Sequence, residues 1–120
     1  MSDIQMGTVE SKFADIIWKN EPITSSELSK RAEECFNWKK TTSFTVLKRL
    51  CDKGIFKNEK GSVSSLISRD EFYSMQSEKF VEDTFEGSLP AFLAAFTKRK
   101  SLNAEEVAQL RRMVEEFEEK

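Results

Sequence analysis

Apolar residues recur at helical spacing along three stretches in the first half of the chain. The first stretch covers residues 8–20 with Thr8 as N-cap, and its apolar positions are Val9, Phe13, Ile16 and Ile17. The second opens with a capping box of Thr24 and Glu27 and extends to about residue 37. We expect it to bury Leu28, Ala32 and Cys35. The spacing therefore predicts two short helices that precede a third.

The third stretch, residues 41–53, has one apolar side and one small, polar and basic side. Thr41 is its expected N-cap, and Gly54 lies where a left-handed residue commonly ends a helix. A step of about 100° per residue from Leu47 puts five residues inside, namely Ser43, Phe44, Leu47, Leu50 and Cys51. It puts Thr42, Thr45, Arg49 and Asp52 outside. This pattern predicts a helix with an exposed polar face.

The helical spacing ends at Gly54. Two short β-prone runs, residues 55–58 and 62–67, flank the turn Glu59-Lys60-Gly61 and predict a hairpin. The order helix, helix, helix, hairpin is that of a winged helix. In that fold the hairpin carries Lys57 and Lys60 toward the DNA backbone.

Helical signals return in the last third of the chain. Ser68 with Glu71 opens a long helix over residues 69–85, which Gly87 ends. Ser88 caps a short Phe-rich helix over residues 89–97, and Asn103 with Glu106 opens the last one. In the last helix, the apolar residues follow one another at intervals of three, four and three positions, as in the heptad seam of a coiled coil. The seam consists of Val107, Leu110, Val114 and Phe117.

This seam needs a surface to bury it, and we expect a second copy of the chain to supply one. The alternative is that the seam folds back on its own domain. The proposed dimerisation residues are those of the seam and four phenylalanines before it, Phe80, Phe85, Phe92 and Phe96.

The composition limits the class of protein to which this chain can belong. At 120 residues, 38% hydrophobic and with ten Phe, the chain can fill the core of one domain with an appendage. Its longest apolar run, residues 89–96, is far short of the roughly twenty residues that span a bilayer. Residues 1–7 lack the features of a signal peptide, so we expect a cytoplasmic protein without membrane insertion. Cys35 and Cys51 occupy apolar positions and are expected to be buried thiols.

The chain lacks the residues that most catalytic and metal sites need. There is no histidine, which removes the commonest general base and most zinc sites, and two cysteines cannot close a structural zinc site. No glycine-rich phosphate loop occurs among the four glycines. We therefore predict no enzyme, no catalytic residues, no cofactor and no metal.

Charge is unevenly distributed, although the net charge is only −2. Residues 1–69 carry a net +3 and residues 70–120 a net −5. Hydroxyls and an arginine on a rigid helix suit the major groove of DNA, with lysines on phosphates. Base readout is assigned to Thr41, Thr42, Thr45 and Arg49, and phosphate contact to Lys39, Lys40, Lys48, Lys57 and Lys60. The alternative for this helix is a solvated basic face.

Several local strings, in order and at similar spacing over residues 6–116, resemble the penicillinase-repressor (BlaI/MecI/CopY) family. They are Asp15-Ile16-Ile17-Trp18, Trp38 before Thr41-Thr42, Thr45-Val46-Leu47-Lys48-Arg49-Leu50, Lys53-Gly54-Ile55, Phe85-Glu86-Gly87 and the helix opening at 102–110. The predicted fold class is mainly α with a small β-hairpin. A winged helix-turn-helix DNA-binding domain, residues 1–68, precedes a helical dimerisation region, residues 69–120.

The resemblance implies a transcriptional repressor that binds a double-stranded DNA operator with dyad symmetry as a homodimer. Thr41, Thr42, Thr45 and Arg49 match positions that face DNA in the family. The position of Phe44 is basic in some relatives, and here the helical spacing turns it inward. The operator sequence is therefore not carried over from those relatives.

Induction differs between branches of that family. In the antibiotic-resistance members, a membrane-bound sensor protease leads to cleavage of an Asn-Phe bond in the dimerisation region. The matching pair here is Ala95-Phe96, a candidate proteolytic site that departs from the pattern at Ala95. Copper-responsive members carry Cys-X-Cys motifs near the C-terminus, whereas this chain has no cysteine after Cys51, so we expect no metal sensing by that route.

Two other functions fit parts of the pattern. A winged-helix protein-interaction module would use the acidic C-terminal region to hold a partner and would never read bases. A ligand-responsive repressor of the MarR type would build its dimer from both chain ends, for which the segment before Thr8 is short.

Overall fold

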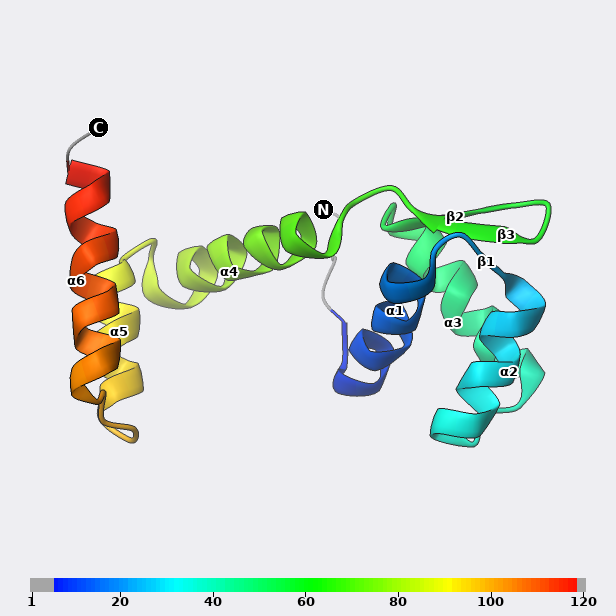
Figure 1. Cartoon of the computed structure of the whole chain (residues 1–120), viewed down its shortest axis with the longest axis horizontal. Helices are drawn as coiled ribbons and strands as arrows, with labels where there is room; N and C mark the ends of the chain where they lie inside the picture. Colours follow the sequence, from blue (N-terminus) through cyan, green and yellow to red (C-terminus); the bar gives the residue numbers. More distant parts are fainter. Residues whose placement is uncertain (1–5, 119–120) are drawn as a thin grey trace. The chain divides into compact units, whose positions relative to one another are not determined.

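The computed structural model describes residues 6–118, which form two compact units that meet in sequence between Ser77 and Glu78. Its helices are α1 (Thr8–Asn20), α2 (Ser25–Phe36), α3 (Lys40–Asp52), α4 (Arg69–Phe85), α5 (Leu89–Thr97) and α6 (Ala104–Glu118). Its strands are β1 (Ile23–Thr24), β2 (Phe56–Glu59) and β3 (Ser62–Ser65) (Figure 1). Within the described residues, no helix combines the length and the apolar character needed to cross a lipid bilayer.

The sheet of the first unit is antiparallel with strand order β1-β3-β2. Glu59 pairs with Ser62, which leaves Lys60 and Gly61 as a two-residue hairpin turn. Both turn residues have positive φ, +52° and +88°, as tight hairpins that follow the twist of their strands require. The predicted fold class, mainly α with a small hairpin, is confirmed. The structure adds β1, because Ile23 pairs with Val63.

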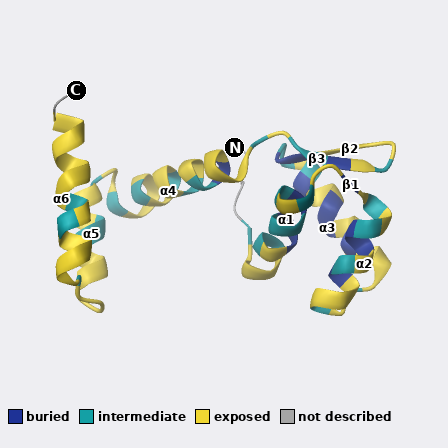
Figure 2. Ribbon diagram, viewed as in Figure 1, coloured by how far each residue is buried: buried dark blue, intermediate teal, exposed yellow. Residues whose placement is uncertain are grey.

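One hydrophobic core holds the first unit together, and it appears as dark blue ribbon in Figure 2. Its largest fully buried side chains are Phe13, Phe56, Phe72, Ile17, Leu28, Leu50, Ile55 and Val63. Trp18 packs on this core against Phe56 and Phe72, with ring centroids 5.1 and 5.7 Å apart. Its indole N–H donates to the carbonyl of Ile67 at 3.0 Å, so a half-buried tryptophan links α1 to the segment before α4.

The helix caps follow the sequence signals in the later elements and depart from them in two earlier ones. Ser88 caps α5 as predicted, and Asn103 with Glu106 forms a reciprocal box at the start of α6. The N-cap of α1 is Gly7 rather than Thr8. Its amide N–H donates to the carboxylate of Glu10 at 3.2 Å, which closes the turn one residue earlier.

The N-cap of helix α3 is Lys39, two positions before the predicted Thr41. No side chain caps this end. The indole of Trp38 instead packs on Phe13 and Phe36, with ring centroids 5.3 and 5.1 Å apart. Packing of the preceding residue therefore fixes where this helix starts, and a local capping signal could not reveal it.

The prediction of buried cysteines is wrong for Cys35, which is exposed, whereas Cys51 is half-buried. Cys35 lies in the last turn of α2, where the neighbouring Phe36 packs against the core. Burial raises the pKa of the Cys51 thiol, and nearby Asp52 adds to that effect.

Candidate nucleic-acid interface

Helix α3 presents a continuous exposed face of small polar and basic side chains. Its buried residues are Ser43, Val46, Leu47 and Leu50. The buried side is therefore rotated by roughly 50° from the predicted one, because Val46 lies inside and Phe44 outside. The predicted inward position of Phe44 is wrong, since 38% of this residue is exposed. All nine predicted DNA contacts are exposed, namely Lys39, Lys40, Thr41, Thr42, Thr45, Lys48, Arg49, Lys57 and Lys60.

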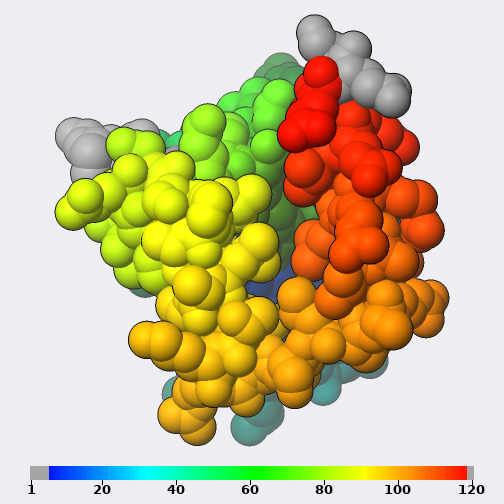
Figure 3. Space-filling model, turned by 90° about the vertical axis from the view of Figure 1, so that its left-hand side faces the viewer, coloured from blue at the N-terminus to red at the C-terminus, as the bar shows by residue number. Residues whose placement is uncertain are grey.

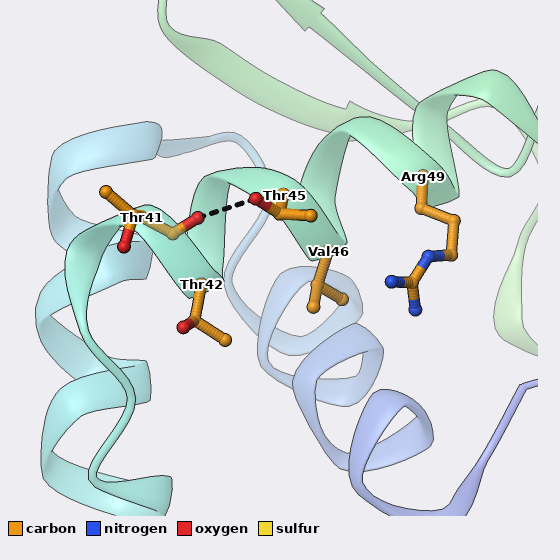
Figure 4. A pocket seen from close by; sticks show the side chains of 5 residues that line it. All are labelled: Thr41, Thr42, Thr45, Val46 and Arg49. Carbon is orange, nitrogen blue, oxygen red and sulfur yellow. Dashed lines mark hydrogen bonds between the residues drawn. The ribbon is translucent and has the colours of Figure 1, made fainter.

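The residues assigned to base readout lie together on this face. Thr41, Thr42, Thr45 and Arg49 line a shallow depression together with Val46 (Figure 4). The hydroxyl of Thr45 donates to the carbonyl of Thr41 at 2.8 Å, the dashed line in Figure 4. This bond holds the threonine side chain in one position on the helix while its oxygen can still accept a hydrogen bond.

Arg49 is held by a residue from another helix. Its Nη1 lies 2.8 Å from Oε2 of Glu10 in α1, and the Glu10 side chain is only 20% exposed. Burial raises the pKa of Glu10, but hydrogen bonds from the Gly7 amide and from Arg49 outweigh it, so the pKa lies below its usual value. The carboxylate is charged at neutral pH and orients the guanidinium.

Glu10 belongs to this site although its position in the sequence did not predict it. The only local signal is its place three residues after Gly7, and that spacing predicts a capping role. The pairing with Arg49 joins positions 39 residues apart, which come together only because α1 and α3 contribute to the same folded core.

The lysines assigned to phosphates are exposed and weakly engaged within the chain. Lys48 pairs with Asp52 at 3.0 Å, and Lys57 pairs with Glu59 at 2.7 Å. Such solvent-exposed pairs contribute only about 0–1 kcal/mol, so they do not prevent a lysine from turning to a phosphate. Lys60 lies in the hairpin turn itself, at the tip of the wing.

The second unit contains the predicted dimerisation residues, and its apolar side chains remain largely uncovered. Phe80, Phe85 and Phe92 contact one another edge to face, with ring centroids 5.7–6.0 Å apart, and Phe96 lies 6.1 Å from Phe92. In the described parts of α5 and α6, no residue is buried.

The seam of α6 is exposed at most of its positions. Leu110 is half-buried and Val107 is exposed, while 58% of Val114 and 72% of Phe117 are accessible. Figure 3 shows α5, in yellow, and α6, in orange and red, diverging on the two sides of a cleft. The chain itself therefore leaves this seam largely open.

The pair Ala95-Phe96 is also accessible. Both residues are exposed, and both lie within helix α5. A peptide bond inside a helix has its backbone hydrogen bonds satisfied, so a protease could reach it in extended form only after α5 opens locally.

Three packed helices, an exposed polar and basic third helix and a two-stranded wing define a winged-helix DNA-binding protein. The model of the penicillinase repressor family matches residues 6–116, and the chain belongs to that family. The family resemblance inferred from the local strings is thereby confirmed.

Relatives and a solved structure agree with this assignment. The chain is 27% identical to the penicillinase repressor of Bacillus licheniformis over 116 residues, which covers 93% of this chain and 91% of the relative. It is 22% identical to that of Staphylococcus aureus over 121 residues, covering 98% and 96%. The solution structure of the DNA-binding domain of the repressor BlaI matches with a TM-score of 0.53 and 26% identity, over 59% of this chain and 93% of that domain. The protein is a winged-helix DNA-binding repressor of this family.

Proposed function

We propose that this protein represses transcription as a homodimer bound to an operator with dyad symmetry. The observation that carries the proposal is the face of α3, where each α3 residue assigned to DNA is exposed and Arg49 is already oriented by Glu10. A two-fold axis between two chains would place two copies of α3 in successive major grooves of one duplex. We propose that the protein acts in the cytoplasm, with duplex DNA as its partner.

Within each half-site, the residues divide into two roles. Thr41, Thr42, Thr45 and Arg49 read base edges, because hydroxyls and a guanidinium can distinguish the groups exposed in the major groove. Lys39, Lys40, Lys48, Lys57 and Lys60 contact phosphates, which sets the register but carries no sequence information.

We propose that the chain dimerises through its second unit. The proposed surface comprises Phe80, Phe85, Phe92, Phe96, Val107, Leu110, Val114 and Phe117. Burying such a surface against a second copy removes apolar area from water at roughly 25 cal/mol per Å². Joining two half-site contacts in one particle then turns two weak interactions into one tight complex.

A mobility-shift experiment on the full chain tests the proposal. Genomic fragments that the protein captures are used as probes at moderate salt with excess competitor DNA. We expect saturable binding that resists the competitor. A shift that the competitor abolishes for every fragment would contradict sequence-specific binding and favour the protein-interaction module.

The salt dependence of that binding tests the phosphate contacts. We expect Lys60→Ala, at the wing tip, to weaken binding to all sequences alike and to reduce the slope of log affinity against log salt by about one unit. Lys19→Ala, an exposed lysine on α1, is the matched control and should leave the slope unchanged. An unchanged slope in both variants would remove the wing from the interface.

Induction by a membrane sensor and its protease is proposed for the bond between Ala95 and Phe96. The test co-expresses the protein with such a sensor system and determines the N-terminal sequence of any fragment. A fragment that begins at Phe96 supports this route, and an intact chain under inducing conditions contradicts it.

A further inference from the structure

Phe44 differs from the other aromatic residues of the first unit by its place on the DNA-facing helix. Phe13, Phe56 and Phe72 are at most 1% exposed, whereas Phe44 is 38% exposed on α3. A buried phenylalanine is explained by the core, but this ring lies among hydroxyls and lysines on the surface that the proposed function assigns to DNA. It therefore requires another explanation.

The neighbours of Phe44 place its ring at one edge of that surface. Thr41 and Lys48 lie three residues before it and four after it, and residues at these spacings are adjacent on a helix. Nζ of Lys40 lies 5.6 Å from the centre of the Phe44 ring. Lysines therefore flank the ring by one turn on either side, and these could lie on phosphates while the ring faces the groove.

The side of Phe44 toward the wing is partly apolar as well. Phe44, Leu47 and Cys51 line a shallow depression together with Lys48 and with Asn58 of β2. The opposite edge of the same helix carries Thr42 and Arg49. The reading face thus has one polar edge and one apolar edge, which suit different groups on base pairs.

Only one base presents an apolar group in the major groove, the C5-methyl group of thymine. Phenylalanine is among the side chains that contact it favourably. We propose that Phe44 is a specificity-determining residue that contacts a thymine methyl group in each operator half-site. This inference rests on the proposed function, since it requires α3 to enter the major groove.

The inference predicts a methyl-dependent affinity. The wild-type full chain first selects its preferred sequence from a library of randomised duplexes. Each thymine of that duplex is then replaced in turn by deoxyuridine, which removes the methyl group and keeps base pairing. We expect one replacement per half-site to weaken binding about fourfold, the effect of one methyl-sized group removed from an apolar contact.

Protein variants test whether Phe44 is the side chain responsible for the loss of affinity on deoxyuridine replacement. In Phe44→Ala, binding to the thymine duplex weakens, and the same deoxyuridine replacement has no further effect, so the two changes are not additive. Phe44→Leu retains an apolar contact and should keep part of the response. Leu66→Ala, which removes a 57% exposed apolar side chain outside α3, is the matched control and should keep the whole response.

The outcomes separate this inference from the proposed function. If the selected duplex binds saturably but no deoxyuridine replacement weakens it, Phe44 reads no methyl group and the inference is overturned while the repressor proposal stands. A response that persists undiminished in Phe44→Ala also overturns it, because another side chain then contacts the methyl group. If no selected duplex resists competitor DNA, the proposed function fails, and the inference fails with it. Circular dichroism and thermal unfolding of each variant confirm that it is folded.

Discussion

At the scale of single residues, Arg49 combines exposure with a fixed orientation. Its side chain is 51% exposed, yet Nη1 is held by Glu10, so the remaining N–H groups of the guanidinium extend from a defined position. A planar fork held in this way can make two parallel hydrogen bonds to guanine, which the ammonium of lysine cannot reproduce.

Replacing Arg49 by lysine tests this geometry without removing the charge. We expect Arg49→Lys to bind unrelated DNA almost as the wild type does and to lose roughly tenfold in preference for its selected duplex, since a bidentate contact contributes about 1–3 kcal/mol of discrimination. Dissociation constants for the selected duplex and for a shuffled one give the ratio. A preserved ratio would mean that Arg49 reads no base.

Ser43 lies on the opposite side of α3 and affects stability rather than recognition. It is 1% exposed, and its hydroxyl makes no hydrogen bond with any part of the chain that the structure describes. A buried hydroxyl without a partner carries an uncompensated desolvation cost of about 1–3 kcal/mol. The cost is tolerated because the side chain is small.

Substitution by alanine should therefore stabilise the fold. We expect Ser43→Ala to raise the free energy of unfolding by about 1 kcal/mol more than Ser74→Ala does. Ser74 is exposed on α4, so the control shares the gain in helix propensity and isolates the effect of the buried hydroxyl. Denaturant unfolding at neutral pH measures both, and equal effects would indicate that the Ser43 hydroxyl has a partner in solution.

At the scale of elements, one carboxylate connects the start of α1 to the face of α3. Glu10 accepts the amide N–H of Gly7 at 3.2 Å and binds Arg49 at 2.8 Å. The cap fixes the carboxylate, and the carboxylate in turn fixes the arginine. In the proposed function, α1 would therefore contribute to recognition through Glu10 as well as to the core.

Glu10→Gln removes the charge but keeps an oxygen for the cap. We expect a severalfold loss of operator preference, smaller than that caused by removing Arg49 itself, because only the orientation of the guanidinium is lost. Glu27→Gln, which breaks the Glu27–Arg31 pair on α2, is the control and should not change the preference. The ratio of the dissociation constants for the selected and the shuffled duplex measures this preference in both variants. An unchanged ratio in Glu10→Gln would mean that Glu10 does not contribute to recognition.

The same residue gives a pH dependence of known sign. Because the pKa of Glu10 is lowered in the folded chain, its charged form stabilises the fold, and this contribution is complete above the pKa of the unfolded carboxyl. It is lost as the pH falls through the lowered pKa. Between neutral and acidic pH, the free energy of unfolding should therefore decrease less steeply in Glu10→Gln than in the wild type. Identical slopes would contradict the lowered pKa of Glu10.

At the scale of the whole molecule, the two units bury their apolar residues to different degrees. The first has a complete core, whereas the described residues of α5 and α6 include none that is buried. Contiguous exposed apolar faces are typical of surfaces that meet a partner. The proposed partner is a second copy, which would also double the number of DNA-reading helices.

A charge in the seam should separate the copies. We expect Val114→Arg to shift the protein from dimer to monomer at micromolar concentration, because an unpaired charge would lie in an apolar interface. Gln109→Arg, at an exposed position outside the seam, is the control and should remain dimeric. Sedimentation velocity measures both. A wild-type chain that is itself monomeric under these conditions would remove the basis for two-site binding.

The sequence by itself determined the elements whose signals are local. The bounds of α4 and α5 agree with the predicted ranges, because Ser68, Ser88 and Gly87 act on the turns next to them. The turn at Gly61 was also predictable from its glycine, and the exposure of Thr42, Thr45 and Arg49 from the helical spacing of their neighbours. The DNA contacts, the dimer and a domain boundary after residue 68 remain predictions.

Only the tertiary structure decided the features that depend on residues far apart in the chain. The rotation of α3 that exposes Phe44 and buries Val46 is set by the elements packed around the helix, and periodicity alone cannot resolve a difference of half a residue step. The pairing of Glu10 with Arg49 and of Ile23 with Val63 likewise requires the folded chain. Local hydrogen bonds specify where most of the helices and strands lie, whereas packing of the core specifies which way each of them faces.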